Sequence, residues 1–256
     1  MKRAYHAPAV GKAFRILQLI SKSDDGAGLS ELAEALEMSK GTVHGVVSAL
    51  EDLGAVLRDP RTRKFTLGFT LFELGKRAYS QIDLKDLARP VLEDLMEKTR
   101  ETAYLGVLNG MRITILDVVE SRQDLKITSP KGSNIPLFAG ATGKVMLASM
   151  EEEQSRTIIM QNKIPRFTEN SITDPELYMR EVREAKERGY ATDYEEYLSG
   201  VWAVASPIRE WKQVPSAIWV VGFKTGLDDK AMQMLIRNTK QAAEEITQKV
   251  KCQRTP

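Results

Sequence analysis

Two histidines and one cysteine limit the chemistry that this chain of 256 residues could perform. A serine–histidine triad or a multi-histidine metal site would need His6 or His44, and Cys252 alone cannot form an internal disulfide or a multi-cysteine zinc site. Three carboxylates cluster late in the chain: Asp193, Glu195 and Glu196. They could act in acid–base chemistry or bind a metal, although a solvated acidic turn is the more common arrangement. We therefore expect no catalytic residue, no metal site and no cofactor, with metal binding by these carboxylates left open.

A second set of polar residues lies between residues 39 and 54, beside apolar residues at helical spacing. Val43, Val47 and Leu50 would form the buried face of a helix there, which leaves the polar face open to solvent. Short polar side chains near the start of such a helix suit contacts with base edges and phosphates in the major groove. The helix residues expected to contact DNA are Lys40, Gly41, Thr42, His44 and Ser48. Ser30 and Ser39 are each expected to cap a helix N-terminus that could bind a phosphate.

Four cationic side chains follow this helix within seven residues: Arg58, Arg61, Arg63 and Lys64. Residues 55–58 and 64–68 indicate two short strands, so the cations would lie on a β-hairpin that suits phosphate contacts or insertion into a minor groove. Taken singly, the helix could be an ordinary core helix and the turn a solvated loop. The order of helix, turn, helix and basic hairpin favours a winged helix-turn-helix that binds double-stranded DNA.

The remaining periodicities place these groups on a larger scaffold. Helices are expected at 8–22, from Ser30 to about 36, and at 39–53, followed by a linker helix ending near residue 80 and a helix over 84–100. Further on, strands are expected at 102–108, 113–119, 190–193, 201–208 and 217–223, with a possible strand at 126–128. Helices are expected at 142–148, 152–160 and 175–188, and Asp228 should cap a long terminal helix. The fold class is therefore α+β, with an antiparallel sheet.

Charge and hydropathy add two broad expectations. The first 80 residues hold 12 Lys and Arg against 9 Asp and Glu, whereas the rest of the chain is slightly acidic, which hints that the N-terminal part meets an anion. No stretch reaches the roughly 18 uninterrupted apolar residues of a membrane span. No apolar signal segment follows the N-terminus, so we expect a cytoplasmic protein without a membrane partner.

With these motifs in place, the chain resembles the IclR family of bacterial transcriptional regulators over nearly its whole length. The matching segments are residues 12–17, 29–33, 39–44, 50–54 and 65–68 in the first part, and 135–144, 188–196 and 200–208 in the second. The resemblance implies a winged helix-turn-helix domain (1–68), a linker helix used in dimer contacts (69–82) and a GAF-like effector-binding domain (83–256). It also implies a homodimer or homotetramer on a pseudo-palindromic operator.

The same resemblance, read together with the residues themselves, gives an expected effector site. Its members are Leu105, Ile135, Phe138, Gly140, Ala141, Thr142, Asp193, Ala203, Trp219 and Val221. Small residues at 140–143 would expose backbone N–H groups that can bind a carboxylate, and Asp193 matches a position that hydrogen-bonds an effector. A phosphate-binding loop is disfavoured because Phe138 and Val145 replace the glycine and the serine or threonine it requires. The family often has arginine where Gly45 stands, and small polar residues where Trp219 and Val221 stand.

These observations predict a ligand-responsive, DNA-binding transcriptional regulator rather than an enzyme. The effector is expected to be a small organic or aromatic carboxylate that changes operator binding, because the pocket positions are apolar and aromatic. Two alternatives remain open at this point. One is a small hydrolase-like enzyme with an appended DNA-binding-like domain. The other is a DNA-binding protein that responds to no effector.

Overall fold

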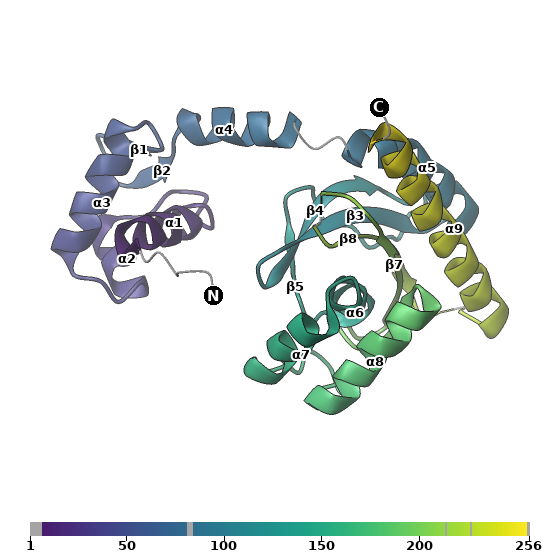
Figure 1. The fold of residues 1–256 in the computed structure, drawn as a ribbon. Helices are drawn as coiled ribbons and strands as arrows, with labels where there is room; N and C mark the ends of the chain where they lie inside the picture. The colour runs from purple at the N-terminus through teal and green to yellow at the C-terminus, as the bar shows by residue number, and fades with distance from the viewer. Residues whose placement is uncertain (1–6, 81–83, 213, 226, 255–256) are drawn as a thin grey trace. The chain divides into compact units, whose positions relative to one another are not determined.

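The computed structural model describes residues 7–80, 84–212, 214–225 and 227–254, so His6 lies outside the described residues. The chain divides into two compact units, Met1–Ile82 and Asp83–Pro256, which are described separately below (Figure 1). Among the described residues, no helix has the length and apolar character needed to cross a membrane.

Three helices and a two-stranded hairpin form the core of the first unit. They are α1 (Pro8–Ile20), α2 (Leu29–Ala35), α3 (Lys40–Asp52), β1 (Val56–Arg58) and β2 (Phe65–Leu67), and α4 (Phe69–Ser80) follows. The strands pair antiparallel, with Arg58 opposite Phe65. Ile16, Leu32, Val43 and Phe65 are buried together, so one apolar stripe from each helix meets the hairpin in a single core. This arrangement is a winged helix-turn-helix, as the sequence predicts.

Two boundaries in this unit differ from the sequence expectations. The first helix ends at Ile20 rather than near Lys22. The second helix begins at Leu29, and its N-cap is Gly28, whose N–H donates to Glu31 Oε2 at 2.8 Å. Ser30 therefore lies inside the first turn and does not cap the helix. Glu31, three residues beyond Gly28, satisfies the N-cap N–H as the glutamate of a capping box does, and glycine is itself a favoured N-cap residue.

The second unit is built around one six-stranded antiparallel sheet. In chain order its elements are α5 (Leu84–Thr99), β3 (Thr102–Asn109), β4 (Arg112–Val119), β5 (Asn134–Pro136), α6 (Gly140–Ala148), α7 (Glu152–Gln161), α8 (Pro175–Arg188), β6 (Ala191–Tyr194), β7 (Val201–Ile208), β8 (Ser216–Phe223) and α9 (Asp229–Arg254). The strand order is β5-β4-β3-β8-β7-β6. Asp228 caps α9 by accepting the Ala231 N–H at 2.7 Å. The α+β class with an antiparallel sheet is confirmed.

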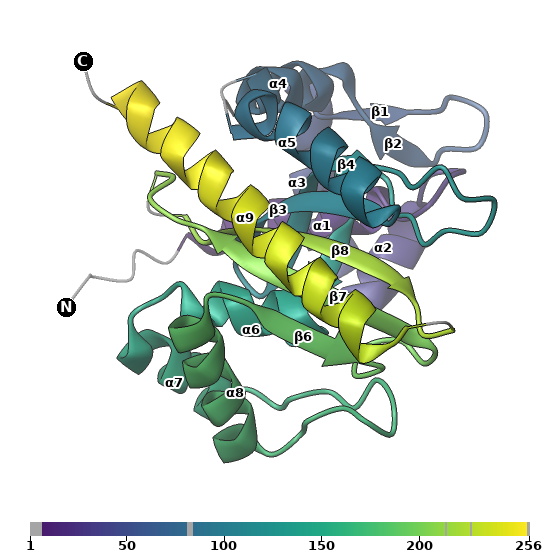
Figure 2. The ribbon, with the colours of Figure 1, turned by 90° about the vertical axis from the view of Figure 1, so that its right-hand side faces the viewer.

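Helices cover both faces of this sheet. Figure 2 shows α5 and α9 side by side on one face, while α6 lies on the other with α7 and α8 outside it. The expectation of a strand at 126–128 is wrong, because that segment belongs to no strand, and the edge strand is β5 at Asn134–Pro136 instead. Pro136 cannot donate a backbone hydrogen bond, which suits an edge strand. A proline within so short a strand also gives no periodic apolar pattern, so the sequence does not predict β5.

Candidate DNA-binding surface and effector cavity

The recognition helix α3 separates its buried and exposed residues as DNA binding requires. Ser39 caps it, because its Oγ accepts the Thr42 N–H at 3.2 Å and lies 2.9 Å from Thr42 Oγ1. Lys40, Gly41 and His44 are exposed on the first turns, while Thr42 and Ser48 are half-buried at the edge of that face. The cap uses the hydroxyls of Ser39 and Thr42 within the helix, which leaves Lys40 and His44 as the freely projecting polar groups.

Two glycines leave the exposed side of α3 without side chains. A Cβ placed on Gly41 or Gly45 would meet no atom within 4 Å. Neither glycine is therefore required by packing inside the protein. The bare backbone beside Lys40 and His44 allows a close approach by another molecule at this face.

The wing carries exposed cations around a turn that Asp59 organises. Its Oδ1 accepts the backbone N–H of Thr62 at 2.6 Å, the hydroxyl of Thr62 at 3.0 Å and the backbone N–H of Arg61 at 2.9 Å, and these hydrogen bonds lower the pKa of Asp59. Arg63 adopts a left-handed φ of 64°, which closes the turn. The guanidinium of Arg58 lies 5.4 Å from the ring centre of Phe65, the buried anchor of the hairpin.

The charges of the wing remain available to a partner. Within the described part of the chain, no ion pair forms at any of the four wing cations, Arg58, Arg61, Arg63 and Lys64. Three of them are exposed and Lys64 is half-buried. Together with Lys40 they give the first unit two basic features, one on the hairpin and one on α3. This combination is suited to anionic phosphates.

A cavity of about 180 Å³ lies in the second unit between the sheet and the N-terminal end of α6. Its lining is mainly aliphatic and aromatic, with Thr142, Asp193 and a few serine and asparagine side chains as polar groups. The full set is Tyr104, Ile115, Ile127, Ser129, Ser133, Asn134, Ile135, Ala139, Thr142, Asp193, Tyr197, Leu198, Val201, Ala203, Trp219 and Val221.

Six of the ten residues expected at the effector site lie around this cavity: Ile135, Thr142, Asp193, Ala203, Trp219 and Val221. The other four do not line it. Leu105 lies on the opposite face of the sheet, because side chains alternate along β3 and Tyr104 takes the cavity side. Phe138 packs edge-to-face on Tyr178, with ring centres 5.5 Å apart. Gly140 and Ala141 are buried in the first turn of α6, behind the residues that face the cavity.

Loops supply most of the lining residues that the sequence patterns missed. Ser129 and Ser133 precede β5, Asn134 is its first residue, and Tyr197 and Leu198 lie in the connection between β6 and β7. Loop residues follow no helical or strand period, so pattern reading carries no signal for them. Tyr104, Ile115 and Val201 are exceptions, since each lies on a strand that the sequence predicts.

Asp193 is the main ionisable group at the cavity, and Gly140 makes room for it. Its Oδ1 accepts the Glu196 N–H at 2.6 Å. A Cβ on Gly140 would lie 1.8 Å from Asp193 Oδ2, and Gly140 has a left-handed φ of 48°, so no other residue fits here without displacing the carboxylate. Burial raises the pKa of Asp193, while its hydrogen bonds and Lys144 counteract part of that shift.

A buried lysine ties the cavity to the outer helices. Lys144 on α6 is 1% exposed, and its Nζ lies 2.6 Å from Glu196 Oε1, 3.1 Å from Glu181 Oε2 and 3.3 Å from the carbonyl oxygen of Thr192. The sequence places Lys144 in the 140–144 motif but gives it no role. In the structure it is the counter-ion that allows Glu196 to be buried.

The acidic cluster of the sequence is accordingly occupied by internal partners. Glu195 pairs with Lys224 and accepts the Gly200 N–H at 2.9 Å, and Glu196 pairs with Lys144. Across the described residues, no group of three or more His, Cys, Asp or Glu side chains is arranged to hold a metal ion. These carboxylates therefore serve the loop that closes the cavity.

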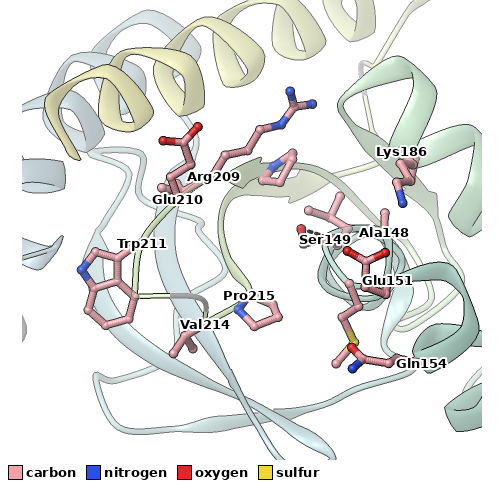
Figure 3. Close-up of a pocket in the computed structure, with 15 residues that line it drawn as sticks. Ala148, Ser149, Glu151, Gln154, Lys186, Arg209, Glu210, Trp211, Val214 and Pro215 are labelled. Carbon is pink, nitrogen blue, oxygen red and sulfur yellow. Dashed lines mark hydrogen bonds between the residues drawn. The ribbon is translucent and has the colours of Figure 1, made fainter. Parts of the chain in front are cut away.

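A larger hollow of about 830 Å³ lies at the opposite, C-terminal end of α6 (Figure 3). Ala148, Ser149 and Pro215 line it, together with the exposed charged side chains of Lys186 and Arg209. Figure 3 shows these charged groups spread around the opening rather than directed at one point. None of the ten residues expected at the effector site lines this hollow, whereas six of them line the smaller cavity.

The two units together define a class of protein: an exposed recognition helix and basic wing joined to a domain with an internal cavity are the parts of a DNA-binding regulator. Comparison with known proteins supports the assignment to this class. Residues 9–60 match the IclR helix-turn-helix domain, and residues 76–248 match the bacterial transcriptional regulator IclR C-terminal domain. The chain therefore belongs to the IclR family of bacterial transcriptional regulators, whose curated relatives are regulators and not enzymes.

Individual relatives support the same assignment over the full length. The chain is 32% identical over 240 residues to the HTH-type transcriptional regulator BhcR of Paracoccus denitrificans, covering 93% of this chain and 86% of BhcR. An IclR regulator from Alicyclobacillus acidocaldarius superposes with a TM-score of 0.79 at 28% identity, covering 96% of this chain and all of that one. An IclR homologue from Microbacterium hydrocarbonoxydans, solved with 4-hydroxybenzoate, has the same fold, with a TM-score of 0.75 at 22% identity over 95% and 99% of the two chains.

Proposed function

We propose that this regulator binds a small effector in the cavity beside α6 and that the bound effector alters its affinity for a pseudo-palindromic operator. The observation that carries the proposal is the convergence of Thr142, Asp193 and Trp219 on one cavity from three distant parts of the chain. Binding in the second unit would change the populations of conformations that place two recognition helices at the operator spacing.

The effector class that fits best is a small aromatic or other organic carboxylate. An engineered cavity of roughly 150 Å³ binds benzene, so about 180 Å³ suits one ring with a small substituent. Ala139, the N-cap of α6, provides no side-chain cap, and the first-turn N–H groups of α6 are therefore suited to a carboxylate. The 4-hydroxybenzoate held by the Microbacterium relative belongs to the same chemical class.

We further propose that the active form is a homodimer or homotetramer acting on DNA in the cytoplasm. Phe69, Phe72 and Leu74 on α4 are each more than 60% exposed, which is costly for a lone helix in water. A second copy of the helix would cover these side chains. Two copies also provide the two recognition helices that a pseudo-palindromic operator requires.

Mobility shift of the upstream intergenic DNA tests both parts of this proposal at fixed salt. We expect the wild-type protein to bind, Lys40→Ala to bind more weakly, and benzoate, 4-hydroxybenzoate or an aliphatic carboxylate to change the wild-type shift. Asp193→Asn should bind the DNA as the wild type does but lose the response. Normal DNA binding that no compound of the panel alters would instead favour an effector-independent DNA-binding protein.

A further inference from the structure

The wall of the cavity opposite α6 is formed by the indole of Trp219, which lies across two strands. Trp219 on β8 is 3% exposed and pairs with Tyr104 on β3. The two rings are stacked, with centres 5.2 Å apart and planes within 6° of each other. Tyr104 is itself fixed, because its hydroxyl donates to the carbonyl oxygen of Ile127 at 3.1 Å. Stacking against an anchored ring therefore holds the indole on one side.

Gly106 supports the far edge of the same indole. It lies two residues beyond Tyr104, on the same face of β3, next to a shift in the register between β3 and β4. A Cβ on Gly106 would lie 2.8 Å from Cη2 and 2.9 Å from Cζ3 of Trp219. It would also lie 3.0 Å from the carbonyl oxygen of Thr114, so β4 prevents the strand from moving aside. Any side chain at position 106 would lift the indole off the sheet.

The direction of that movement decides the size of the cavity. Tyr104 blocks the indole on its stacked side, and the strands lie beneath it, so the free space is the cavity itself. The cavity has room for about one benzene-sized ring, and even a small shift of the indole would remove that room. The absence of a Cβ at position 106 is therefore a condition for ligand binding, although Gly106 does not line the cavity.

We propose that Gly106 is a positioning residue that lets Trp219 lie close against β3 and thereby limits the effector to a single ring. This inference rests on the proposed function, since it specifies the size class of ligand at the same cavity. Trp219 sets the limit directly, and Gly106 acts through it.

Gly222 offers a matched control on the other face of the sheet. A Cβ there would lie 2.6 Å from Trp202 Cζ2 and 2.7 Å from Glu101 Cδ, and neither residue lines the cavity. Gly106→Ala and Gly222→Ala thus both force a methyl group against a tryptophan in the same sheet. General destabilisation should affect both variants, whereas a change of the cavity should affect only the first.

The first experiment needs no ligand. Full-length protein labelled at the tryptophan indole nitrogens is compared by NMR in the wild type and both glycine variants, with the signals assigned from Trp→Phe variants. We expect Gly106→Ala to shift the Trp219 signal and Gly222→Ala to shift the Trp202 signal. An unmoved Trp219 signal in folded Gly106→Ala would overturn the role of Gly106.

The second experiment measures binding of benzoate, with one ring, and 2-naphthoate, with two fused rings, by calorimetry. We expect the wild type and Gly222→Ala to prefer benzoate, and Gly106→Ala to bind it at least about tenfold more weakly, a loss of about 1.4 kcal/mol. Trp219→Ala should gain affinity for 2-naphthoate.

The outcomes separate the two proposals. Equal benzoate affinity in the wild type, Gly222→Ala and Gly106→Ala would overturn the inference and leave the proposed function intact. A wild-type protein that binds neither probe, and whose operator binding neither probe alters, would overturn the proposed aromatic effector and the single-ring limit with it.

Discussion

At the scale of single residues, the second unit depends on a few buried charges that the fold has to neutralise. Lys144 is 1% exposed, while its partner Glu196 is 14% exposed and Glu181 is at the surface. Burial raises the pKa of Glu196, and the neighbouring Lys144 opposes that rise. A buried ion pair contributes little net stability over an apolar pair, but loss of one partner leaves an uncompensated buried charge.

Replacement of Lys144 by methionine should therefore lower the free energy of unfolding by about 3–5 kcal/mol, as removal of one partner of a buried pair does. Urea unfolding followed by circular dichroism measures this change. The double variant Lys144→Met/Glu196→Gln should recover part of the loss, because it removes the unpaired carboxylate. A double variant that is less stable than Lys144→Met would contradict this account.

A second carboxylate, Glu101, gives a pH-dependent prediction. Burial beside Trp202 and Gly222 raises its pKa to about 7. The folded protein thus holds this proton more tightly than the unfolded chain, whose glutamate releases it near pH 4.5. The stabilisation that comes from this tighter proton binding at Glu101 is fully present below pH 4.5 and is lost as the pH rises through about 7.

Glu101→Gln should remove that loss, because a neutral side chain has no proton to release. We expect the variant to be more stable than the wild type at pH 8, with the difference shrinking towards pH 5. Thermal unfolding across this range in matched buffers measures the effect. Parallel pH profiles for the two proteins would show that Glu101 is not the group responsible.

At the scale of elements, α3 and the wing present separate kinds of contact. The helix exposes Lys40 and His44 beside bare backbone at Gly41 and Gly45. The wing presents guanidinium groups on a turn held by hydrogen bonds to Asp59. Guanidinium groups on a turn suit sequence-independent phosphate contacts, whereas the first turns of a helix suit base edges.

Arg61→Ala/Arg63→Ala should weaken operator and non-operator DNA binding alike. Each lost phosphate contact should reduce the slope of log affinity against log salt by about 0.9, so the expected change is about 2. Fluorescence anisotropy at several salt concentrations measures both quantities. Lys98→Ala/Lys249→Ala is the charge-matched control, since both lysines pair within helices of the second unit. A slope that the wing variant leaves unchanged would place the wing away from the DNA.

At the scale of the whole molecule, the proposed two-fold operator would require a second copy of the chain. The exposed apolar side chains of α4 are the surface where we propose that this copy packs. Coupling between effector and operator would then be reciprocal. Operator DNA would change the affinity for the effector by the same factor as the effector changes the affinity for operator DNA.

Phe72→Glu should convert the protein to a smaller species, because it places a charge within the apolar surface of α4. Sedimentation equilibrium or light scattering measures the mass, and operator affinity should fall in parallel. Lys76→Glu changes the charge of the same exposed helix without touching an apolar residue, and it should leave the mass unchanged. Equal masses for Phe72→Glu and the wild type would exclude α4 as the dimer contact.

Elements with strong local signals can be predicted from the amino-acid sequence. Ser39 caps α3 as predicted, α8 and β7 have the predicted bounds, and the winged helix-turn-helix and the antiparallel α+β class follow from helical spacing and short turns. These features depend on neighbouring residues, so periodicity and capping suffice to predict them. Six of the residues expected at the effector site line one cavity, because their motif segments lie at the ends of such elements.

The set of side chains that meet at the cavity depends on contacts between distant parts of the chain. Strand alternation places Tyr104 there instead of Leu105, and pairing of β3 with β8 brings Trp219 onto Gly106 from more than a hundred residues away. The counter-ions of Lys144 come from α8 and from the segment after β6, which no local pattern links to α6. Register and long-range packing settle these contacts, and neither leaves a periodic trace in the sequence.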